Sequence, residues 1–555
     1  MCSKCSNKAK RWWSLGISVG ICVIAIALGV SWPFIIEKEV EKQFVFTPGT
    51  QLYDNWLNPP IDTLLELYLW NWTNTEDYRG DNYKPHLEQL GPYTFREKKE
   101  RVDLKWDDDE DTLTFYQRRI WHFEPEMSKG DLENDMVVTI NPILLTIGFM
   151  IQDSPYQDFI DSILNLNPQF VDNPFYNVRV KDILFDGYDD VLLANLIKLL
   201  EENEGLAGLF ELPPFDKFGW FYGRNESETY DGNFTIARGT SNFQDLGILK
   251  LWNAVNQTEF YRDECGAVHG TTGELWPPFQ DRMLSNVTVF SSDICSAMTL
   301  EYDGGSRVHG IAGLKWKGNE RVFNNGNNYT ETECQCTAPK EQCPVLKSGA
   351  MDVSRCKMGA PATVSYPHFY LADDSYLAEV EGLKPEEEEH KFIMILEPHT
   401  GIPLQVKAQL QVNLDVKEYG LTLLKDIPEV MLPVLWFRQT AQLNEELASD
   451  LKNGKKMFNI VHGKELFSDN LSRCGSLYVV VCCGLRSQRV CVIRRRVKSG
   501  HRTNAIAVEA QCFEDNRSTE AVVPLGVKAN SYQAALRIRR QIRFGTARSN
   551  VSSLS

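Results

Sequence analysis

Six cysteines are the residues whose spacing most directly suggests chemistry. They fall within 92 residues and are the only cysteines between positions 37 and 473: Cys265, Cys295, Cys334, Cys336, Cys343 and Cys356. An even number of clustered cysteines predicts three disulfides in an oxidising compartment, among fifteen possible pairings. Residues 334–356 could instead offer four thiolates to zinc, but their spacing lacks the usual paired C-x-x-C. We therefore predict disulfides and no metal site.

Glycosylation signals lie in the same part of the chain. Six N-x-S/T sequons occur there, at Asn71, Asn225, Asn233, Asn256, Asn286 and Asn328. Each sequon predicts a surface asparagine in a chain exposed to the secretory pathway. Three more follow at Asn470, Asn516 and Asn550, in a region whose side of the membrane the sequence leaves open.

Signals for catalysis are scarce. The chain has no G-x-S-x-G, no H-E-x-x-H and no phosphate-binding glycine loop. The acidic runs Asp107–Asp111 and Glu386–Glu389 are typical of solvated loops, with calcium binding as the weaker alternative. His368 has no nucleophile beside it in the sequence. We predict neither an enzyme nor a cofactor; a glycosidase would need a carboxylate pair that sequence cannot show.

The charge distribution indicates a membrane protein. The net charge is −17, from 58 basic and 75 acidic residues, which argues against nucleic acid as a partner. Trp12–Ile36 is an uncharged run of 25 residues, whereas about 20 suffice to cross a bilayer. A cleaved signal peptide usually has a shorter apolar core, of about 7–15 residues. We predict a cytoplasmic tail over 1–11, a signal-anchor helix over 12–36 and an acidic body outside the cell.

Two features accompany this predicted anchor. Cys2 and Cys5 lie among lysines just before it, where thiols can be palmitoylated or remain ordinary reduced cysteines. Gly16 and Gly20 form a G-x-x-x-G pattern, which predicts close approach of two helices in a homodimer, although glycine is common in membrane helices.

The body of the chain has the periodicity of β-strands. From Leu404 to Val416 apolar and polar residues alternate strictly, which predicts a long strand with one buried and one wet face. The apolar run Phe392–Leu396 and a turn around Pro398 precede it and predict a hairpin. Further strand-like stretches at 112–123, 232–239 and 286–290 predict a large antiparallel sheet or barrel.

Residues 143–212 instead carry helical patterns. Ser154 can cap a helix that starts with Pro155, followed by an apolar stripe of Tyr156, Phe159, Ile160, Ile163 and Leu164. Asp189 or Asp190 can cap a second helix, with a stripe of Leu192, Leu196, Leu199 and Leu200. We expect the two stripes to pack against each other. The fold class is therefore mainly β with inserted helices.

Several motifs resemble one family, in the same order along the chain. They are residues 71–74 (NWTN), 84–85 (KP), 91–97 (GPYTFRE), 218–225 (FGWFYGRN), 231–232 (DG), 276–279 (WPPF), 367–369 (PHF), 396–398 (LEP), 400–401 (TG) and 432–437 (LPVLWF). Over about residues 1–450 the chain resembles the class B scavenger receptors, the family of fatty-acid translocase and the high-density-lipoprotein receptor. Its opening residues and the stretch around Asn225 are most similar to the insect croquemort-like receptors.

The resemblance implies an ectodomain over 37–458 that is an antiparallel β-barrel topped by a helical bundle at 143–212. It also implies an apolar tunnel that passes lipid to the bilayer, and disulfides Cys265–Cys334, Cys295–Cys356 and Cys336–Cys343. The expected function is that of a receptor for lipids, lipoproteins, or apoptotic-cell or microbial surfaces, located in the plasma membrane, with endosomal membranes as a further location. The alternative is a lipid-transfer protein or a sensory-neuron-type lipid co-receptor of the same fold.

Two regions depart from the family. A second membrane helix is expected near the end, but the longest uncharged run there, Cys474–Leu485, has twelve residues and is too short to span. Residues 459–555 are therefore expected to be an unrelated, basic C-terminal region. Residues 143–212 hold twelve acidic and three basic residues, so anionic particles should not be drawn to the apex directly.

Overall fold

The computed structural model describes residues 45–80, 82–166, 173–202, 215–278, 286–449, 451–452, 490–497, 506–514 and 517–521, with seven further positions between 16 and 31. The chain forms two compact units. One is Glu37–Gly454, which lies within the ectodomain predicted at 37–458, and the other combines Met1–Ile36 with Lys455–Ser555.

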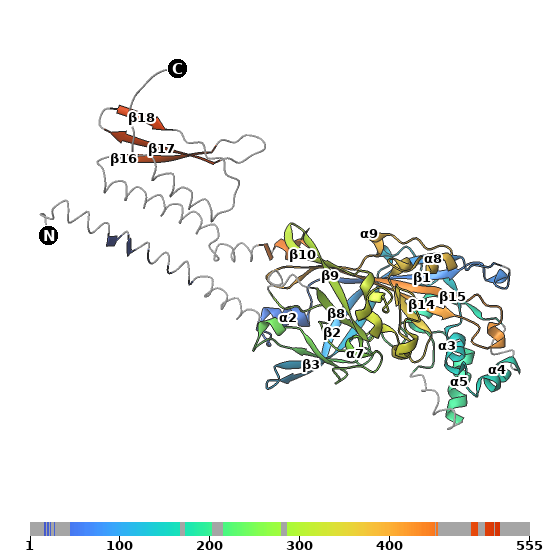
Figure 1. Cartoon of the computed structure of the whole chain (residues 1–555). Coiled ribbons are helices and arrows are strands. Elements are labelled where there is room, and N and C mark those ends of the chain that lie inside the picture. Colours follow the sequence, from blue (N-terminus) through green and yellow to red (C-terminus); the bar gives the residue numbers. More distant parts are fainter. Residues whose placement is uncertain are drawn as a thin grey trace, which may run out of the picture. The chain divides into compact units, whose positions relative to one another are not determined.

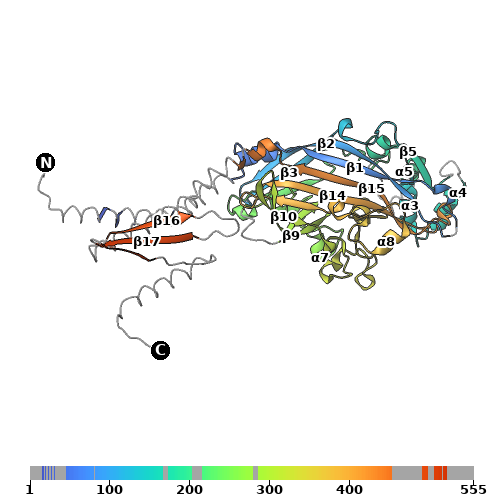
Figure 2. The ribbon, with the colours of Figure 1, turned by 90° about the horizontal axis from the view of Figure 1, so that it is seen from above.

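The unit Glu37–Gly454 is built on one large antiparallel sheet. Its thirteen strands follow the order β7-β6-β3-β2-β1-β15-β14-β13-β10-β9-β8, with β12 beside β14 and β11 beside β12. Figure 2 shows β1, β2, β14 and β15 running side by side. The strands are β1 Thr63–Trp72, β2 Leu87–Asp107, β3 Thr112–Phe123, β6 Asn233–Ala237, β7 Leu249–Trp252, β8 Val287–Ser291, β9 Ser296–Val308, β10 Ile311–Lys317, β11 Ala350–Asp352, β12 Ala362–Ser365, β13 Ile393–Leu396, β14 Pro403–Val416 and β15 Val430–Gln442.

The two ends of this sheet are joined through Gly270 and Thr271. The N–H of Leu249 in β7 donates to the Gly270 carbonyl at 2.8 Å, and the N–H of Phe290 in β8 donates to the Thr271 carbonyl at 2.9 Å. Gly270 has a φ of +82°, and a Cβ there would lie 2.5 Å from the carbonyl oxygen of Thr288. A segment bonded to both edge strands nearly closes the sheet into a barrel. The predicted antiparallel sheet or barrel is confirmed.

Helices gather at one end of this unit, as predicted for residues 143–212 (Figure 1). They are α3 Pro142–Ile151, α4 Gln157–Leu166 and α5 Val191–Glu202, beside a two-stranded sheet of β4 Met136–Ile140 and β5 Phe175–Arg179. Asp190 caps α5, because its Oδ1 accepts from the Leu193 N–H at 2.8 Å. Helix α4 begins three residues after the expected cap Ser154. The strand β5 was not expected.

The predicted packing of the two helical stripes is wrong in part. On α4, Ile160 and Leu164 are buried, but Phe159 is 54 % exposed, and Tyr156, which directly precedes the helix, is 38 % exposed. Helix α5 packs chiefly on α3, while α4 packs on the short 3-10 turn Thr422–Leu424. The carboxylate of Asp161 fixes α4 there by accepting from the Thr422 N–H at 2.8 Å. Because each stripe has its own partner, part of the α4 stripe stays exposed.

The burial of side chains along strand β14 differs from the prediction of one buried and one wet face. Its polar residues Gln409, Gln411 and Asn413 are completely buried, whereas the apolar Val406 and Ala408 are only half-buried. The predicted wet face is therefore wrong. The polar side chains form hydrogen bonds with residues 363–391. For example, the Gln409 amide donates to the carbonyls at positions 389 and 391 at 2.8 and 2.9 Å. The strand itself and the β13–β14 hairpin are confirmed.

The second unit contains a three-stranded antiparallel sheet that the sequence did not predict. Its strands are β16 Val490–Val497, β17 Ile506–Glu514 and β18 Arg517–Ala521, in the order β16-β17-β18.

Membrane crossing is not visible in the described residues, among which no helix is both long enough and apolar enough to traverse a bilayer. The tail 1–11, with Cys2 and Cys5, and most of the predicted anchor 12–36 lie outside those residues, as does the run 474–485. Gly16 and Gly20 are helical positions. The anchor, the acylation sites and the homodimer therefore stay predictions.

Candidate functional site

The interior of the barrel holds a cavity of about 120 Å³. Its walls come from strands β2, β3, β6, β8, β9, β14 and β15, together with residues 272, 292, 293 and 392. These strands are spread from one edge of the sheet to the other, so the cavity lies inside the barrel. Small-molecule sites are commonly concave and combine apolar walls with a small number of polar groups.

One part of the wall is apolar. It consists of Phe234, Val289, Phe290, Met298, Phe392, Ala408, Leu410 and Phe437. Ala408 and Phe437 are half-buried although they face the barrel interior, because the space in front of them is not filled by protein. This accounts for the partial burial of Ala408: the polar face of β14 is packed, and Ala408 and Leu410 of its apolar face line the cavity.

The other part of the wall is polar and charged. It includes Lys99, Gln117, Arg119, Asp293 and Gln439. The completely buried carboxylate of Glu97 pairs with Arg119 and accepts from the Gln439 amide. Burial alone would raise the pKa of Glu97, but Arg119 and Lys99 outweigh it and lower that pKa. The ion pairs keep these buried groups charged, so the cavity is amphipathic.

A second cluster surrounds Arg224, beside the cavity. Arg224 pairs with Asp231 and with Asp293, both at 2.7 Å. Arg119 lies 3.9 Å from Asp231, and both guanidinium groups lie over the Trp121 ring. The pKa of Asp293 falls well below its usual range, because the nearby Arg224 outweighs burial, which alone would raise it.

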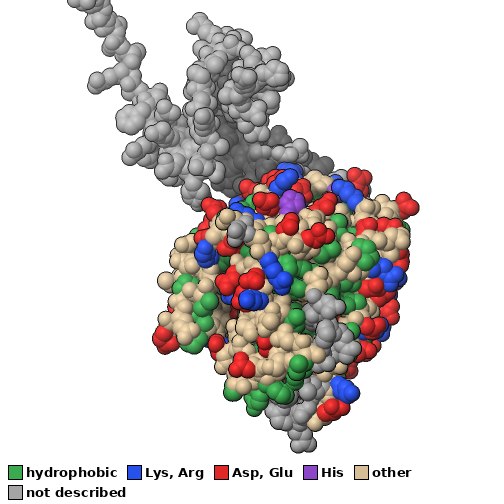
Figure 3. All heavy atoms as spheres, turned by 90° about the vertical axis from the view of Figure 1, so that its right-hand side faces the viewer, with side chains coloured by type: hydrophobic (Ala, Val, Ile, Leu, Met, Phe, Trp, Pro, Cys, Tyr) green, Lys and Arg blue, Asp and Glu red, His purple; other side chains and the backbone are tan. Residues whose placement is uncertain are grey.

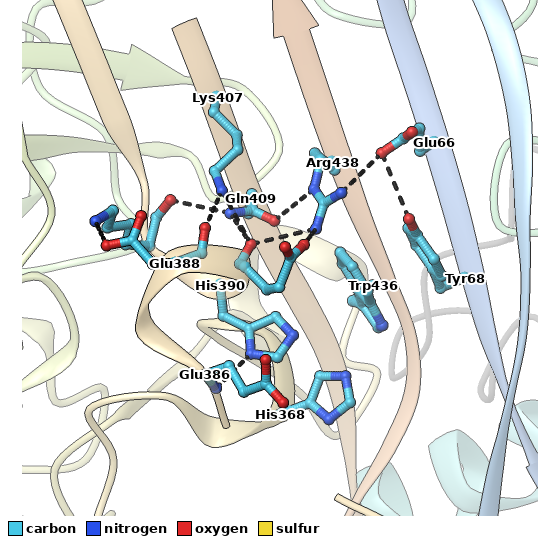
Figure 4. A network of polar contacts seen from close by, with 12 residues as sticks. Glu66, Tyr68, His368, Glu386, Glu388, His390, Lys407, Gln409, Trp436 and Arg438 are labelled. Atoms are coloured by element: carbon cyan, nitrogen blue, oxygen red, sulfur yellow. Dashed lines mark hydrogen bonds and ion pairs between the residues drawn. The ribbon is translucent and has the colours of Figure 1, made fainter. Parts of the chain in front are cut away.

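His368, which the sequence singled out without a partner, belongs to a buried network around β15 (Figure 4). Its Nδ1 accepts from the Lys384 N–H at 3.0 Å. Its Nε2 lies 2.9 Å from Gln89 Oε1, an acceptor that also receives the Trp436 indole N–H. Nε2 must therefore carry the proton, and the ring is neutral. His368 stacks on His390 with centroids 4.2 Å apart, which suits a structural role.

The acidic runs behave differently from one another. Residues 108–111 form the exposed turn between β2 and β3, where Asp108 pairs with Arg238. In the second run Glu388 (Figure 4) is 83 % exposed, as expected for a solvated loop. Glu389 instead pairs with Arg438 at 2.9 Å. Among the described residues, no group of three or more His, Cys, Asp and Glu side chains could hold a metal ion.

The six cysteines pair as Cys265–Cys334, Cys295–Cys356 and Cys336–Cys343, with Cα atoms 5.6, 6.1 and 6.1 Å apart. These are the three pairs that the family resemblance implied. Because all six sulfur atoms are used, none remains as a thiolate ligand for the zinc alternative.

The sequon asparagines lie mostly at the surface. Asn225, Asn256, Asn286 and Asn328 are exposed. Asn71 and Asn233 are half-buried. The Asn71 side chain accepts from the Val138 N–H at 2.8 Å, and Asn233 donates to the Tyr116 hydroxyl at 3.4 Å. Both side chains are therefore hydrogen-bonded to neighbouring strands.

A nearly closed antiparallel barrel around an amphipathic cavity, with helices at one end and three disulfides, is the type of domain that the motifs resemble. Comparison with known proteins agrees: the model of the CD36 family matches residues 14–483, and the chain belongs to this family. The matched residues include 459–483, and the boundary at 459 stays a prediction.

Individual relatives come from insects and mammals. The chain is 32 % identical to Protein peste of Drosophila melanogaster over 452 residues, covering 80 % of this chain and 78 % of that protein. It is 30 % identical over 490 residues to scavenger receptor class B member 1 of Mus musculus, covering 87 % and 91 %. It is 28 % identical over 444 residues to lysosome membrane protein 2 of Homo sapiens, covering 79 % and 87 %.

Proposed function

We propose that this protein is a scavenger receptor, anchored in the plasma membrane by residues 12–36, that takes up lipid through its barrel. The observation that carries the proposal is the cavity inside the barrel, with one apolar and one charged wall. Membership of a family that includes scavenger receptors supports it. In this proposal the glycosylated body faces outside the cell, and lipid passes through the cavity toward the bilayer.

The physical basis is the transfer of hydrocarbon between two apolar environments. Each methylene group removed from water gains about 0.8 kcal/mol, so an acyl chain is stable beside Phe392, Leu410 and Phe437. The bilayer offers the same gain, so passage from the cavity to the membrane needs little net free energy.

Capture of lipoproteins, apoptotic cells or microbes would take place at the helical end. Figure 3 looks onto this end, where acidic side chains are spread and hydrophobic ones gather at the lower edge. The described bases among residues 143–202 are Arg179, Lys181 and Lys198, and each lies within 4 Å of a carboxylate. On α4 the large side chains of Phe159 and Leu166 are exposed. This surface supports capture by apolar contact, by a cation bridge or by a soluble adaptor.

The test compares two kinds of uptake by cells that express the full chain: labelled apoptotic cells, and free labelled fatty acid or sterol ester. Ala408→Trp places an indole in the cavity, and Gln405→Trp adds the same group on the other face of β14 as a control. With equal amounts at the cell surface, Ala408→Trp should lose lipid uptake and keep particle binding. Equal lipid uptake by both variants would contradict the proposal. Lipid uptake without particle uptake would favour the lipid-transfer or co-receptor alternative.

A further inference from the structure

Strands β16 and β17 of the second unit bring two cysteines opposite each other. The strands are antiparallel neighbours (Figure 1), and their register pairs Cys491 with Cys512. Residues directly opposite in an antiparallel pair share a face of the sheet, with Cα atoms about 4.5 or 5.5 Å apart. Two cysteines can form a disulfide when their Cα atoms lie about 4.4–6.8 Å apart. The register therefore places this pair within disulfide range.

The other cross-strand pairs of β16 and β17 support the same register. Arg494 lies opposite Glu509, and Val497 lies opposite Ile506. Opposite charges and apolar residues that face each other directly stabilise a sheet. A shift of one residue would move one strand's residues to the other face, set Arg494 against an uncharged residue and separate Cys491 from Cys512.

The two cysteines have no competing thiol in this sheet. The sequences of β16, β17 and β18 contain Cys491 and Cys512 and no other cysteine. Cys512 lies in the central strand, where its second cross-strand neighbour is Thr519. Two thiols fall short of the four ligands of a structural zinc site. The pair is therefore suited to a disulfide rather than to a metal.

The surrounding sequence favours an oxidising compartment for this sheet. The barrel unit of the same chain carries three disulfides, so the chain folds where thiols are oxidised. The uncharged run 474–485 has twelve residues, whereas a helix needs about 20 to cross a bilayer. The sequon Asn516 lies between β17 and β18. A sheet that follows this run without a crossing stays in the compartment of the barrel unit.

We propose that Cys491 and Cys512 form a disulfide, additional to the three of the barrel unit, that links β16 to β17 in the same compartment as that unit. The oxidant is the disulfide of a thiol–disulfide oxidoreductase of the secretory pathway. One cysteine thiolate attacks that disulfide, and the other then displaces the enzyme thiol from the mixed disulfide. One S–S bond forms and one breaks; the two electrons and two protons pass to the enzyme, which leaves as a dithiol.

This inference shares with the proposed function only the single anchor over 12–36. A failure of lipid uptake would therefore leave it standing, and its own failure would leave the cavity of the barrel unaffected.

The test maps the disulfides of the full-length protein isolated from the surface of expressing cells. Free thiols are alkylated, N-glycans are removed with an amidase, and trypsin releases residues 490–494, which contain Cys491, and 503–517, which contain Cys512. Without reduction the two peptides should be recovered as one linked species that carries no alkyl label. Peptide 503–517 also contains Asn516, so its conversion to aspartate by the amidase records a glycan in the same molecule.

Two variants separate the register of the sheet from mere closeness in the sequence. Cys491→Ser combined with Val492→Cys moves the thiol to the other face of β16, opposite Gln511. The linked species should be lost, and Cys512 should become alkylated. Cys474→Ser is the control, because it removes a cysteine that precedes the sheet and should leave the linked species at the wild-type yield.

The outcomes that overturn the proposal are distinct from one another. Free thiols at both positions with a glycan on Asn516 would show that the compartment is right and the register is wrong. Free thiols without that glycan would overturn the shared compartment as well. A bond from Cys512 to one of the cysteines at 474, 482 and 483, or a wild-type yield of linked peptides in the combined variant, would show that the register does not select the partner.

Discussion

Acidification should destabilise the barrel through His368 and His390. Burial is the main cause that lowers the pKa of both rings, to about 3 for His368 and about 4 for His390. The neighbouring His390 adds to the shift of His368. Arg438 and Lys407 lower the pKa of His390 further, and Glu389 opposes them. Both rings are therefore neutral in the folded protein across the physiological range.

The sign and size follow from proton binding. The ordinary histidine pKa is 6.5, so below that pH the unfolded chain binds two protons that the folded protein does not. The contribution of the two neutral rings to stability is fully present above pH 6.5 and is lost as the pH falls toward 4 and then 3. At pH 5 each ring should lower the free energy of unfolding by roughly 2 kcal/mol, and the pair should lower it by about 4 kcal/mol.

Thermal unfolding of the full-length protein, followed by tryptophan fluorescence from pH 7.5 to 5.0, measures this loss. Trp70 and Trp436 lie 4.8 and 5.9 Å from the His368 ring and report on its surroundings. His390→Phe should remove about half of the decrease, whereas the same change at the exposed His122 should leave it unaltered. A wild-type unfolding temperature that stays constant when the pH is lowered from 7.5 to 5.0 would refute the reasoning.

Replacing Cys295 and Cys356 by alanine should lower the unfolding free energy by roughly 2–5 kcal/mol, because their disulfide joins residues 61 apart; an unchanged denaturant midpoint would contradict this. Gly270→Ala should open the barrel edge at a cost of about 1–3 kcal/mol, since a Cβ there meets the Thr288 carbonyl at a positive φ. Hydrogen exchange at the Leu249 amide measures it, and unaltered protection would count against it. Phosphatidylserine liposomes should bind expressing cells only with calcium or an adaptor; calcium-free binding that weakens steeply with salt would show a basic capture site.

The strands could be predicted because their signal is local. Alternation from Leu404 to Val416 specifies an extended segment with two faces whatever surrounds it. Which face is wet depends on contacts distant in the sequence. Gln409 and Gln411 are buried because residues 363–391 bond them, and no pattern within the strand encodes that partner.

The candidate site was predicted only in outline. The cysteines could be recognised as a disulfide group, although their pairing came from the family resemblance. Glu97, Lys99 and Arg101 went unremarked, because alternating charges on a strand are usually a solvated face. Their place in an interior cluster depends on partners such as Glu274, which lies more than 170 positions away in the sequence.

By itself the sequence determined the predominance of strands, the helical insertion at 143–212, the cysteine group and the family motifs, because each depends on neighbouring residues or short spacings. The tertiary structure decided where water is excluded. Closure through Thr271 turns the inner face of β2 into a cavity wall and leaves Arg101 buried with two guanidinium nitrogens that have no partner among the described residues. Burial and charge pairing depend on contacts between segments far apart in the chain, so no local pattern could specify them.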